Sequence, residues 1–275
     1  MQGFKYNVLV YPGIYMSKEE LSTLTDELRN VSSKCFDEVP YYQTLTGKRD
    51  EFQRAIICTA RNSNGVLVGF CSSLVLDIDA IGSVLHLGLT CVDPIARGKK
   101  LTHKLMNKLL VKYLLMESPI NGVWVSNCAC VLSSLGNVAL YFEDIYPSPF
   151  NNKAPSAQHL KIAQGISQSH RAAMAVNYDA NFNCKTFVFE GSVSDSVFEK
   201  SESDAKYYHR NPELTDYYKN ILNFERGDEV LQVGRISLLT LPKYVFSSSL
   251  RKFKTKLSSF DTAHIGSDLN ESTAN

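Results

Sequence analysis

The sequence predicts an α/β protein built on a mixed, mostly antiparallel sheet that is flanked by helices. Two observations carry this prediction. Residues 55–76 hold two β-rich runs joined through an Asn64-Gly65 pair, which is typical of an antiparallel hairpin. Residues 83–131 then follow the order strand, helix, strand, and two strands joined through a helix are expected to be parallel neighbours.

The first strand and the first helix follow from local spacing. Residues 4–11 alternate in polarity as a strand does, and Pro12-Gly13 closes the run. Ser17 and Glu20 form a capping box, so we expect a helix from about Ser17 to Ser33. Its apolar stripe has helical spacing and consists of Leu21, Leu24, Leu28 and Val31.

The middle of the chain is expected to supply the parallel unit. It consists of a strand over 83–92, a helix from about Gly98 to Met116 and a buried strand over 123–131. Ser133 or Ser134 can cap a further helix, which we expect to run through Ile145 and to end before Pro147.

The remainder of the chain is less regular. Strands are expected at 185–191 and 229–239, where they would join the sheet begun by residues 4–10. Residues 148–181 and 192–228 are expected to be insertions in a single domain that spans 1–256. The polar end of the sequence, 257–275, has little to bury and is expected to be a flexible tail.

Composition excludes several classes of protein. The 275 residues include 29 Lys+Arg and 28 Asp+Glu, and a net charge of +1 argues against a protein that coats nucleic acid. No apolar run is long enough to span a bilayer, and the N-terminus lacks the pattern of a secretory signal. The seven cysteines lie mostly in apolar runs without metal-site spacing, which favours reduced thiols in a cytoplasmic protein.

The segment from Leu85 to Leu110 is the most informative part of the chain. A strand ends at Val92, and the helix that follows begins among basic or potentially basic side chains: Arg97, Lys99, Lys100, His103 and Lys104. Cations oppose the helix dipole at this end, so an anion bound at the helix start would explain them. The alternative is a solvated basic turn, because each misplaced charge costs at most about 1 kcal/mol.

The same segment resembles the acetyl-CoA loop of the GCN5-related N-acetyltransferases (GNAT). The matching residues are Val92, Pro94, Arg97 and Gly98, while Lys100 and Thr102 replace the small residues that are usual in the family. The resemblance implies a GNAT-like sheet whose parallel central strands splay apart to admit acetyl-CoA, with no metal. It also implies that the cosubstrate is bound by Thr90, Val92, Arg97, Gly98, Lys99, Lys100, Leu101 and Thr102.

Two catalytic residues are implied by the same resemblance. His86 stands where family members often place the base that accepts the amine proton, and strand alternation predicts that it shares a face with Gly88, Thr90 and Val92. The alternative is a buried core histidine. Tyr141 would protonate the departing thiolate, unless the register shifts Phe142 onto that position or the ring packs on the core.

The resulting hypothesis is an acetyl-CoA-dependent transferase that moves an acetyl group directly to an amine on a small molecule or a peptide. A non-catalytic member of the fold that binds acyl-CoA or a protein is one alternative, and an unrelated phosphate-binding α/β protein is another. No nucleic-acid or membrane partner is expected, and the oligomeric state is left open.

Overall fold

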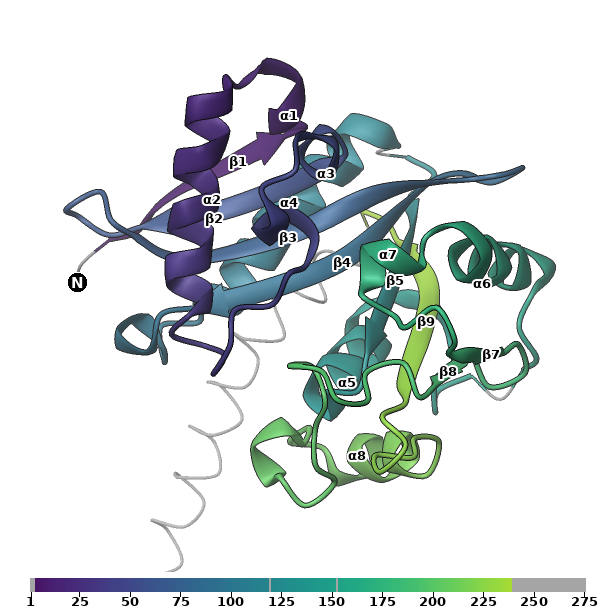
Figure 1. Ribbon diagram of the computed structural model, residues 1–275. Helices are drawn as coiled ribbons and strands as arrows, with labels where there is room; N and C mark the ends of the chain where they lie inside the picture. Colours follow the sequence, from purple (N-terminus) through teal and green to yellow (C-terminus); the bar gives the residue numbers. More distant parts are fainter. Residues whose placement is uncertain (1–2, 119, 152, 239–275) are drawn as a thin grey trace, which may run out of the picture.

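One mixed sheet organises the molecule (Figure 1). The computed structural model describes residues 3–118, 120–151 and 153–238, and its strands follow the order β1-β2-β3-β4-β5-β9-β8-β7, with β6 paired to β9. The pair β4–β5 is parallel and the other described pairs are antiparallel, as the sequence predicted. The strands are Lys5–Val10 (β1), Ala55–Arg61 (β2), Leu67–Ile78 (β3), Gly82–Val92 (β4), Val123–Ala129 (β5), Glu143–Tyr146 (β6), Asn181–Asn183 (β7), Val188–Glu190 (β8) and Glu229–Ile236 (β9).

Helices cover both faces of this sheet. Face A carries α2 and α6 over a core that includes Leu28, Leu74 and Ile162, and face B carries α4 over Leu85 and Leu109. The helices are Pro12–Tyr15 (α1), Lys18–Ser32 (α2), Arg49–Gln53 (α3), Leu101–Glu117 (α4), Leu132–Tyr141 (α5), Ala157–Ser169 (α6), Arg171–Met174 (α7) and Pro212–Lys219 (α8). Short 3₁₀ turns lie at Gln43–Thr46 (η1), Pro94–Ala96 (η2) and Ala205–Tyr207 (η3). No helix in the described ranges is long and apolar enough to cross a membrane.

The capping box predicted for α2 is present. Ser17 Oγ accepts from Glu20 N at 3.1 Å, and the Glu20 carboxylate accepts from Ser17 N at 2.7 Å. The apolar stripe then buries Leu28 and Val31 completely against face A. Each such side chain contributes about 1.5–3 kcal/mol on burial, so packing on the sheet stabilises this helix more than its cap does.

The helix expected to run through Ile145 is shorter than predicted. It ends at Tyr141, and Phe142 is extended and leads into β6, which pairs with β9. The physical reason lies in Gly234 of β9, because a Cβ there would stand 2.1 Å from the Ile145 side chain. A strand therefore buries Ile145 in a hollow that a continued helix would leave empty.

The two segments expected to be insertions contribute to the core. Residues 148–181 contain α6 and α7, and Ile166 of α6 is fully buried on face A. Residues 192–228 contain η3 and α8, and α8 packs with α5 in a third apolar cluster around Leu135 and Leu214. The predicted strands at 185–191 and 229–239 appear as β8 and β9 in the same sheet as β1. Residues 257–275 lie outside the described residues.

A bulge in β4 corrects one prediction about the site. Ser73 pairs with Leu87 and Cys71 pairs with Thr90, so Gly88 and Leu89 together stand opposite Ser72. The extra residue inverts the alternation beyond this point. His86 therefore lies on face A with its partner Leu74, whereas Thr90 and Val92 face the opposite side, and the expected shared face is wrong.

Candidate functional site

The parallel strands β4 and β5 separate in the middle of the sheet. Their register runs from Val84 opposite Trp124 to Leu87 opposite Asn127 and ends there. Strand β4 nevertheless continues to Val92 along β3. The stretch Gly88–Val92 is therefore an edge without a β5 partner, and we call it the open edge of β4.

Backbone groups of the open edge are directed toward the gap. Asp93 N donates to Val68 O of β3 at 3.0 Å. Peptide groups of successive residues in an antiparallel pair point alternately to the two sides, so those of Val92 and Thr90 point away from β3. The Val92 carbonyl receives Cys35 Sγ at 3.5 Å and Arg97 Nε at 3.4 Å. An extended ligand with amide groups could pair with this edge as another strand would.

The turn after the open edge is fixed by Asp93. Its carboxylate accepts from Ile95 N at 3.0 Å and from Lys34 Nζ at 2.6 Å. Burial alone would raise the pKa of Asp93, but the hydrogen bonds from Lys34 and Ile95 outweigh it and lower the pKa. An ionised Asp93 thus ties the start of the loop to the end of α2.

The loop contains two residues with left-handed backbone. Gly98 has φ 76°, and Lys100, the N-cap of α4, has φ 58°. Left-handed backbone costs a non-glycine residue about 1–2 kcal/mol, so Lys100 adopts a conformation that favours glycine.

The loop is also an exposed basic surface at a helix start. Arg97, Gly98, Lys99, Lys100 and Thr102 are exposed, whereas Leu101 is buried against face B. The first turn of α4 contains no acidic residue. Side-chain charge and helix dipole therefore have the same positive sign here, which is the electrostatic setting for an anion such as a phosphate.

His86 pairs with Ser126 and comes directly before Leu87, the last β4 residue in register with β5. It is fully buried, and its Nδ1 stands 3.0 Å from Ser126 Oγ of β5. Its Nε2 has no hydrogen-bond partner among the described residues. Burial lowers the pKa of His86 to about 3, and the charges of His170 and Arg54 act in the same direction. The imidazole is therefore neutral at physiological pH, and its role as a base stays a prediction.

Tyr141 is the last residue of α5 and is buried, with 6% of its surface exposed. Phe142 follows as the C-cap and packs on the apolar cluster of face B. The two residues that the sequence left as alternatives thus stand side by side at the end of one helix. The role of Tyr141 as an acid remains a prediction.

Gln43 lies beside the open edge of β4, and the sequence did not single it out. It lies in η1, is 3% exposed and has φ 43°. A Cβ on Gly88 would stand 2.1 Å from Gln43 Oε1, so the glycine in the open edge makes room for this side chain. Glycine inside a strand indicates close approach by another group, and this was the available signal.

Glu229 at the start of β9 is a buried acid that the sequence did not single out. It is 6% exposed, and its Oε2 accepts hydrogen bonds from Ser192 Oγ at 3.0 Å and from Cys128 Sγ at 3.7 Å. Burial raises the pKa of Glu229 to about 7, against the lowering effects of Ser192, Cys128 and Lys200. No sequence pattern distinguishes this acid from an exposed one at a strand start.

The segment 192–228 reaches the gap through Phe198. The Phe198 ring packs against Tyr42 with centroids 5.4 Å apart and against Phe36 at 6.1 Å. The Phe198 carbonyl accepts from Cys130 Sγ at 3.3 Å, just beyond the end of β5. This segment therefore connects the end of β5 with η1 on face A.

The chain was compared with known proteins. No protein-family model matches it, and no curated protein sequence matches it. Solved acetyltransferase structures do match. The GNAT family N-acetyltransferase YhbS from Escherichia coli, in complex with CoA, is 14% identical with a TM-score of 0.32, over 47% of this chain and 64% of that chain. Tetrahymena GCN5 is 12% identical with a TM-score of 0.34, over 46% of this chain and 71% of that chain. Glucosamine-6-phosphate N-acetyltransferase from Arabidopsis thaliana is 19% identical with a TM-score of 0.25, over 42% of this chain and 76% of that chain.

The resemblance drawn from the loop is thus confirmed as a likeness to GNAT structures over somewhat less than half of the chain. At identities and TM-scores this low, the likeness carries no argument about activity. The fold is defined by the strand order and register given above, and the chemistry has to be argued from the residues.

Proposed function

We propose that the protein is an acetyl-CoA-dependent N-acetyltransferase that transfers the acetyl group directly to an amine. The observation that carries the proposal is the open edge of β4, which leads through an ordered turn into the basic start of α4. The open edge suits the amide groups of an extended ligand, and the basic helix start suits phosphates at the end of that ligand. The reduced-thiol pattern of the cysteines favours action in the cytoplasm.

The residues present fit coenzyme A. Backbone groups of Thr90 and Val92 would pair with the amides of its extended arm, and the exposed loop would hold its phosphates. The loop residues are Arg97, Gly98, Lys99, Lys100, Leu101 and Thr102. When bound, the thioester supplies an acyl carbon open to attack. Val92 N–H would polarise its carbonyl by donating a hydrogen bond.

The amine nitrogen would form a bond to the acyl carbon while the carbon–sulfur bond breaks. Neutral His86 would receive the amine proton through a water at Nε2, since the buried ring has no other described partner there. Tyr141 would give its phenolic proton to the departing sulfur. Charge is balanced because one proton leaves nitrogen and one reaches sulfur.

A protein that binds acyl-CoA without catalysis is the second candidate. The complete burial of His86 favours it, because a proton acceptor needs a connection to the reacting nitrogen. Release of free thiol from acetyl-CoA, measured over a panel of amines, separates the two candidates: the enzyme releases thiol in proportion to amine, and the binding protein does not.

The loop assignment is tested by charge reversal. Arg97→Glu combined with Lys99→Glu should weaken acetyl-CoA binding in calorimetry at least tenfold and reduce its salt dependence. The matched control is Lys161→Glu with Lys185→Glu, two exposed cations on other elements, which should leave the affinity unchanged. Equal affinity in both pairs would reject the loop as the phosphate site.

A further inference from the structure

A row of lysines lies along the outer face of α4. Lys104, Lys108 and Lys112 are exposed, and their four-residue spacing places successive side chains about 6 Å apart along one side of the helix. The first acidic residue within α4 is Glu117, at its last position. The exposed basic loop before the helix continues the positive charge beyond its start. We call Lys104, Lys108 and Lys112 the lysine row.

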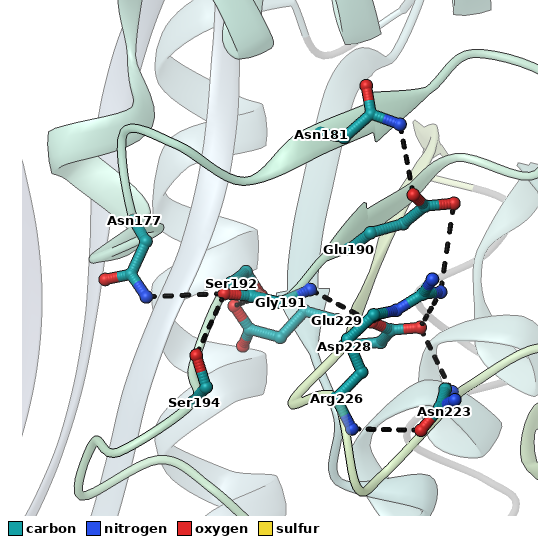
Figure 2. A network of polar contacts seen from close by, with 10 residues as sticks. All are labelled: Asn177, Asn181, Glu190, Gly191, Ser192, Ser194, Asn223, Arg226, Asp228 and Glu229. Carbon is teal, nitrogen blue, oxygen red and sulfur yellow. Dashed lines mark hydrogen bonds and ion pairs between the residues drawn. The ribbon is translucent and has the colours of Figure 1, made fainter.

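Neighbouring carboxylates do not neutralise the lysine row. No ion pair to its three ammonium groups exists in the described part of the chain. Other cations are paired: Arg226 donates to both carboxylate oxygens of Asp228 at 2.7 and 2.8 Å and lies 3.8 Å from Glu190 (Figure 2). Like charges four residues apart destabilise a helix, so the row does not serve the stability of α4.

Aromatic rings restrict two of the cations on this surface. Lys108 Nζ lies over the Tyr6 ring, 5.1 Å from its centroid, and Lys99 Nζ lies over the Phe4 ring at 5.4 Å. The ring faces attract the ammonium groups. Tyr6 belongs to β1, an edge strand of the sheet, and Phe4 directly precedes this strand. A partner therefore meets cations that are already partly ordered, which lowers the entropic cost of binding.

Apolar side chains are exposed at the far end of the same helix. Leu115 is 57% exposed and stands seven residues after Lys108, which places it on the same side of α4. Met116 is 39% exposed, and Ile120, three residues beyond the helix, is 89% exposed. Large exposed apolar side chains that gather on one surface are typical of a contact with a protein or a membrane.

The helix on the opposite face of the sheet is acidic. In α2, which covers face A (Figure 1), the exposed acids Glu19, Glu20 and Asp26 outnumber the exposed cations Lys18 and Arg29. The sequence predicted no membrane partner because its net charge is +1 and it has no spanning run. Neither property describes how charge is distributed over the folded surface. A molecule with one basic side and one acidic side is oriented by a negatively charged plane.

We propose that the outer face of α4 binds an anionic membrane surface, with the lysine row against the lipid headgroups and Leu115, Met116 and Ile120 inserted among them. Clusters of roughly four to eight lysines and arginines on a helix are typical of sites for anionic lipids. The apolar stripe of α4 is buried in the protein, so the helix would lie on the membrane and not penetrate it. The inference goes beyond the proposed function and does not depend on acetyl-CoA.

A membrane accounts for more of this surface than a nucleic acid does. The phosphates of a nucleic acid would also pair with the lysine row. They would leave Leu115, Met116 and Ile120 without an apolar contact, whereas a membrane attracts cations through its anionic lipids and apolar side chains through its acyl chains. The two kinds of side chain on one helix surface therefore favour the membrane.

Sedimentation with lipid vesicles tests the proposal on the full chain. The protein should bind vesicles of phosphatidylcholine that contain about 30% phosphatidylserine, and it should bind pure phosphatidylcholine vesicles at least about tenfold more weakly. Added salt should weaken the binding, because it screens exposed charges. Equal affinity for the two kinds of vesicle would overturn the inference.

The lysine row is tested by removing its charge. Lys104→Gln, Lys108→Gln and Lys112→Gln in one chain should lower the affinity for the anionic vesicles at least about tenfold. The control carries the same change on three exposed lysines of other elements: Lys18→Gln, Lys161→Gln and Lys185→Gln. Its affinity should stay within about twofold of the wild type. An equal loss in both variants would reject the row as the binding surface.

A second variant of the row keeps the test decisive if the glutamine variant folds poorly. Lys104→Arg, Lys108→Arg and Lys112→Arg preserve the charge and should bind the anionic vesicles as the wild type does. The melting temperature of each variant reports its folding. A folded arginine variant that has lost vesicle binding would contradict an electrostatic contact.

The apolar contact has its own test. Leu115→Ser combined with Ile120→Ser should weaken vesicle binding, and the loss should persist at high salt, where the lysines are screened. Ile14→Ser combined with Tyr178→Ser is the control, since these side chains are 69% and 80% exposed on other elements. Unchanged binding in the first variant would remove the apolar contact.

The remaining outcomes separate the alternatives. Binding of single-stranded poly(U) RNA without binding of anionic vesicles would overturn the inference in favour of a nucleic-acid surface. The vesicle experiments contain no acetyl-CoA. A protein that binds anionic vesicles but neither binds acetyl-CoA nor releases thiol would therefore remove the proposed function and leave this inference standing.

Discussion

At the scale of single residues, His86 shows how burial and chemistry interact. Its ring is fully buried against Ser126, and the low pKa keeps it neutral at physiological pH. A neutral imidazole is the form that accepts a proton, yet a pKa of about 3 makes it a weak base. Proton transfer at this residue would therefore require a substrate nitrogen that becomes strongly acidic as it bonds to the acyl carbon.

His86→Gln is expected to bind acetyl-CoA normally and to lose roughly two to four orders of magnitude in turnover, the usual contribution of general base catalysis. Part of the lost rate should return at high pH, where more amine is already deprotonated. Single-turnover rate and melting temperature are measured on one preparation. A variant that loses melting temperature but keeps its rate per folded molecule would identify His86 as a core residue.

Glu229 predicts an unusual dependence of stability on pH. The unfolded chain releases this proton near the ordinary pKa of 4.5, while the folded protein holds it to about 7. The free energy of unfolding therefore falls by roughly 3 kcal/mol in total as the pH rises between these two values, and it is constant above them. In Glu229→Gln this loss is absent, so the variant should gain stability relative to the wild type between pH 5 and pH 8. Urea denaturation at both pH values measures the difference, and a parallel loss in both proteins would contradict the assignment.

Gly88 tests the packing of Gln43 against the open edge of β4. A Cβ there would stand 2.1 Å from Gln43 Oε1 and 2.9 Å from the Ser72 carbonyl. Gly88→Ala should therefore lower the free energy of unfolding by about 1–3 kcal/mol, the usual cost of overpacking. Gly3→Ala, which would meet nothing within 4 Å, is the control and should change stability little. Equal stability of both variants would mean that Gln43 moves aside without cost.

At the scale of elements, the loop between β4 and α4 combines left-handed backbone at Lys100 with an ion pair at its other end. Lys100 has φ 58° at the N-cap of α4, while Asp93 and Lys34 anchor the opposite end of the loop. The anchoring contacts offset the local strain.

Lys100→Gly should relieve that strain and leave the free energy of unfolding unchanged or higher by up to about 1 kcal/mol. Lys100→Val, with a β-branched side chain in the left-handed region, should lower it by at least a similar amount. Chemical denaturation of both variants compares them directly. A glycine variant that is less stable than the valine variant would show that Lys100 is held by its side chain and not by its backbone.

At the scale of the whole molecule, β9 connects the two halves of the chain. It lies between β5 and β8 in the sheet, although it is the last described strand in the sequence. Residues 148–238 thus contribute a strand to the middle of the sheet as well as α6 to face A. We therefore expect a single domain.

Limited proteolysis tests this expectation. Cuts should occur within 192–228, where long connections surround η3 and α8, and the fragments should remain associated under native conditions because β9 is paired on both sides. Size-exclusion chromatography of the cut protein measures the association. Release of a folded fragment that contains 148–275 alone would indicate two domains.

The sequence by itself determined the elements that local chemistry controls. The capping box of α2, the hairpin at Asn64-Gly65, the parallel crossover between β4 and β5 and the basic start of α4 all depend on residues close together in the chain. The tertiary structure decided which side chains meet. The bulge at Gly88 places Thr90 and Val92 on the face of the sheet opposite to His86. The absence of a side chain at Gly234 leaves room for Ile145, which lies in a strand. Gln43 comes to lie against Gly88, and Glu229 against Cys128, and no local pattern can encode a contact between residues so far apart in the sequence.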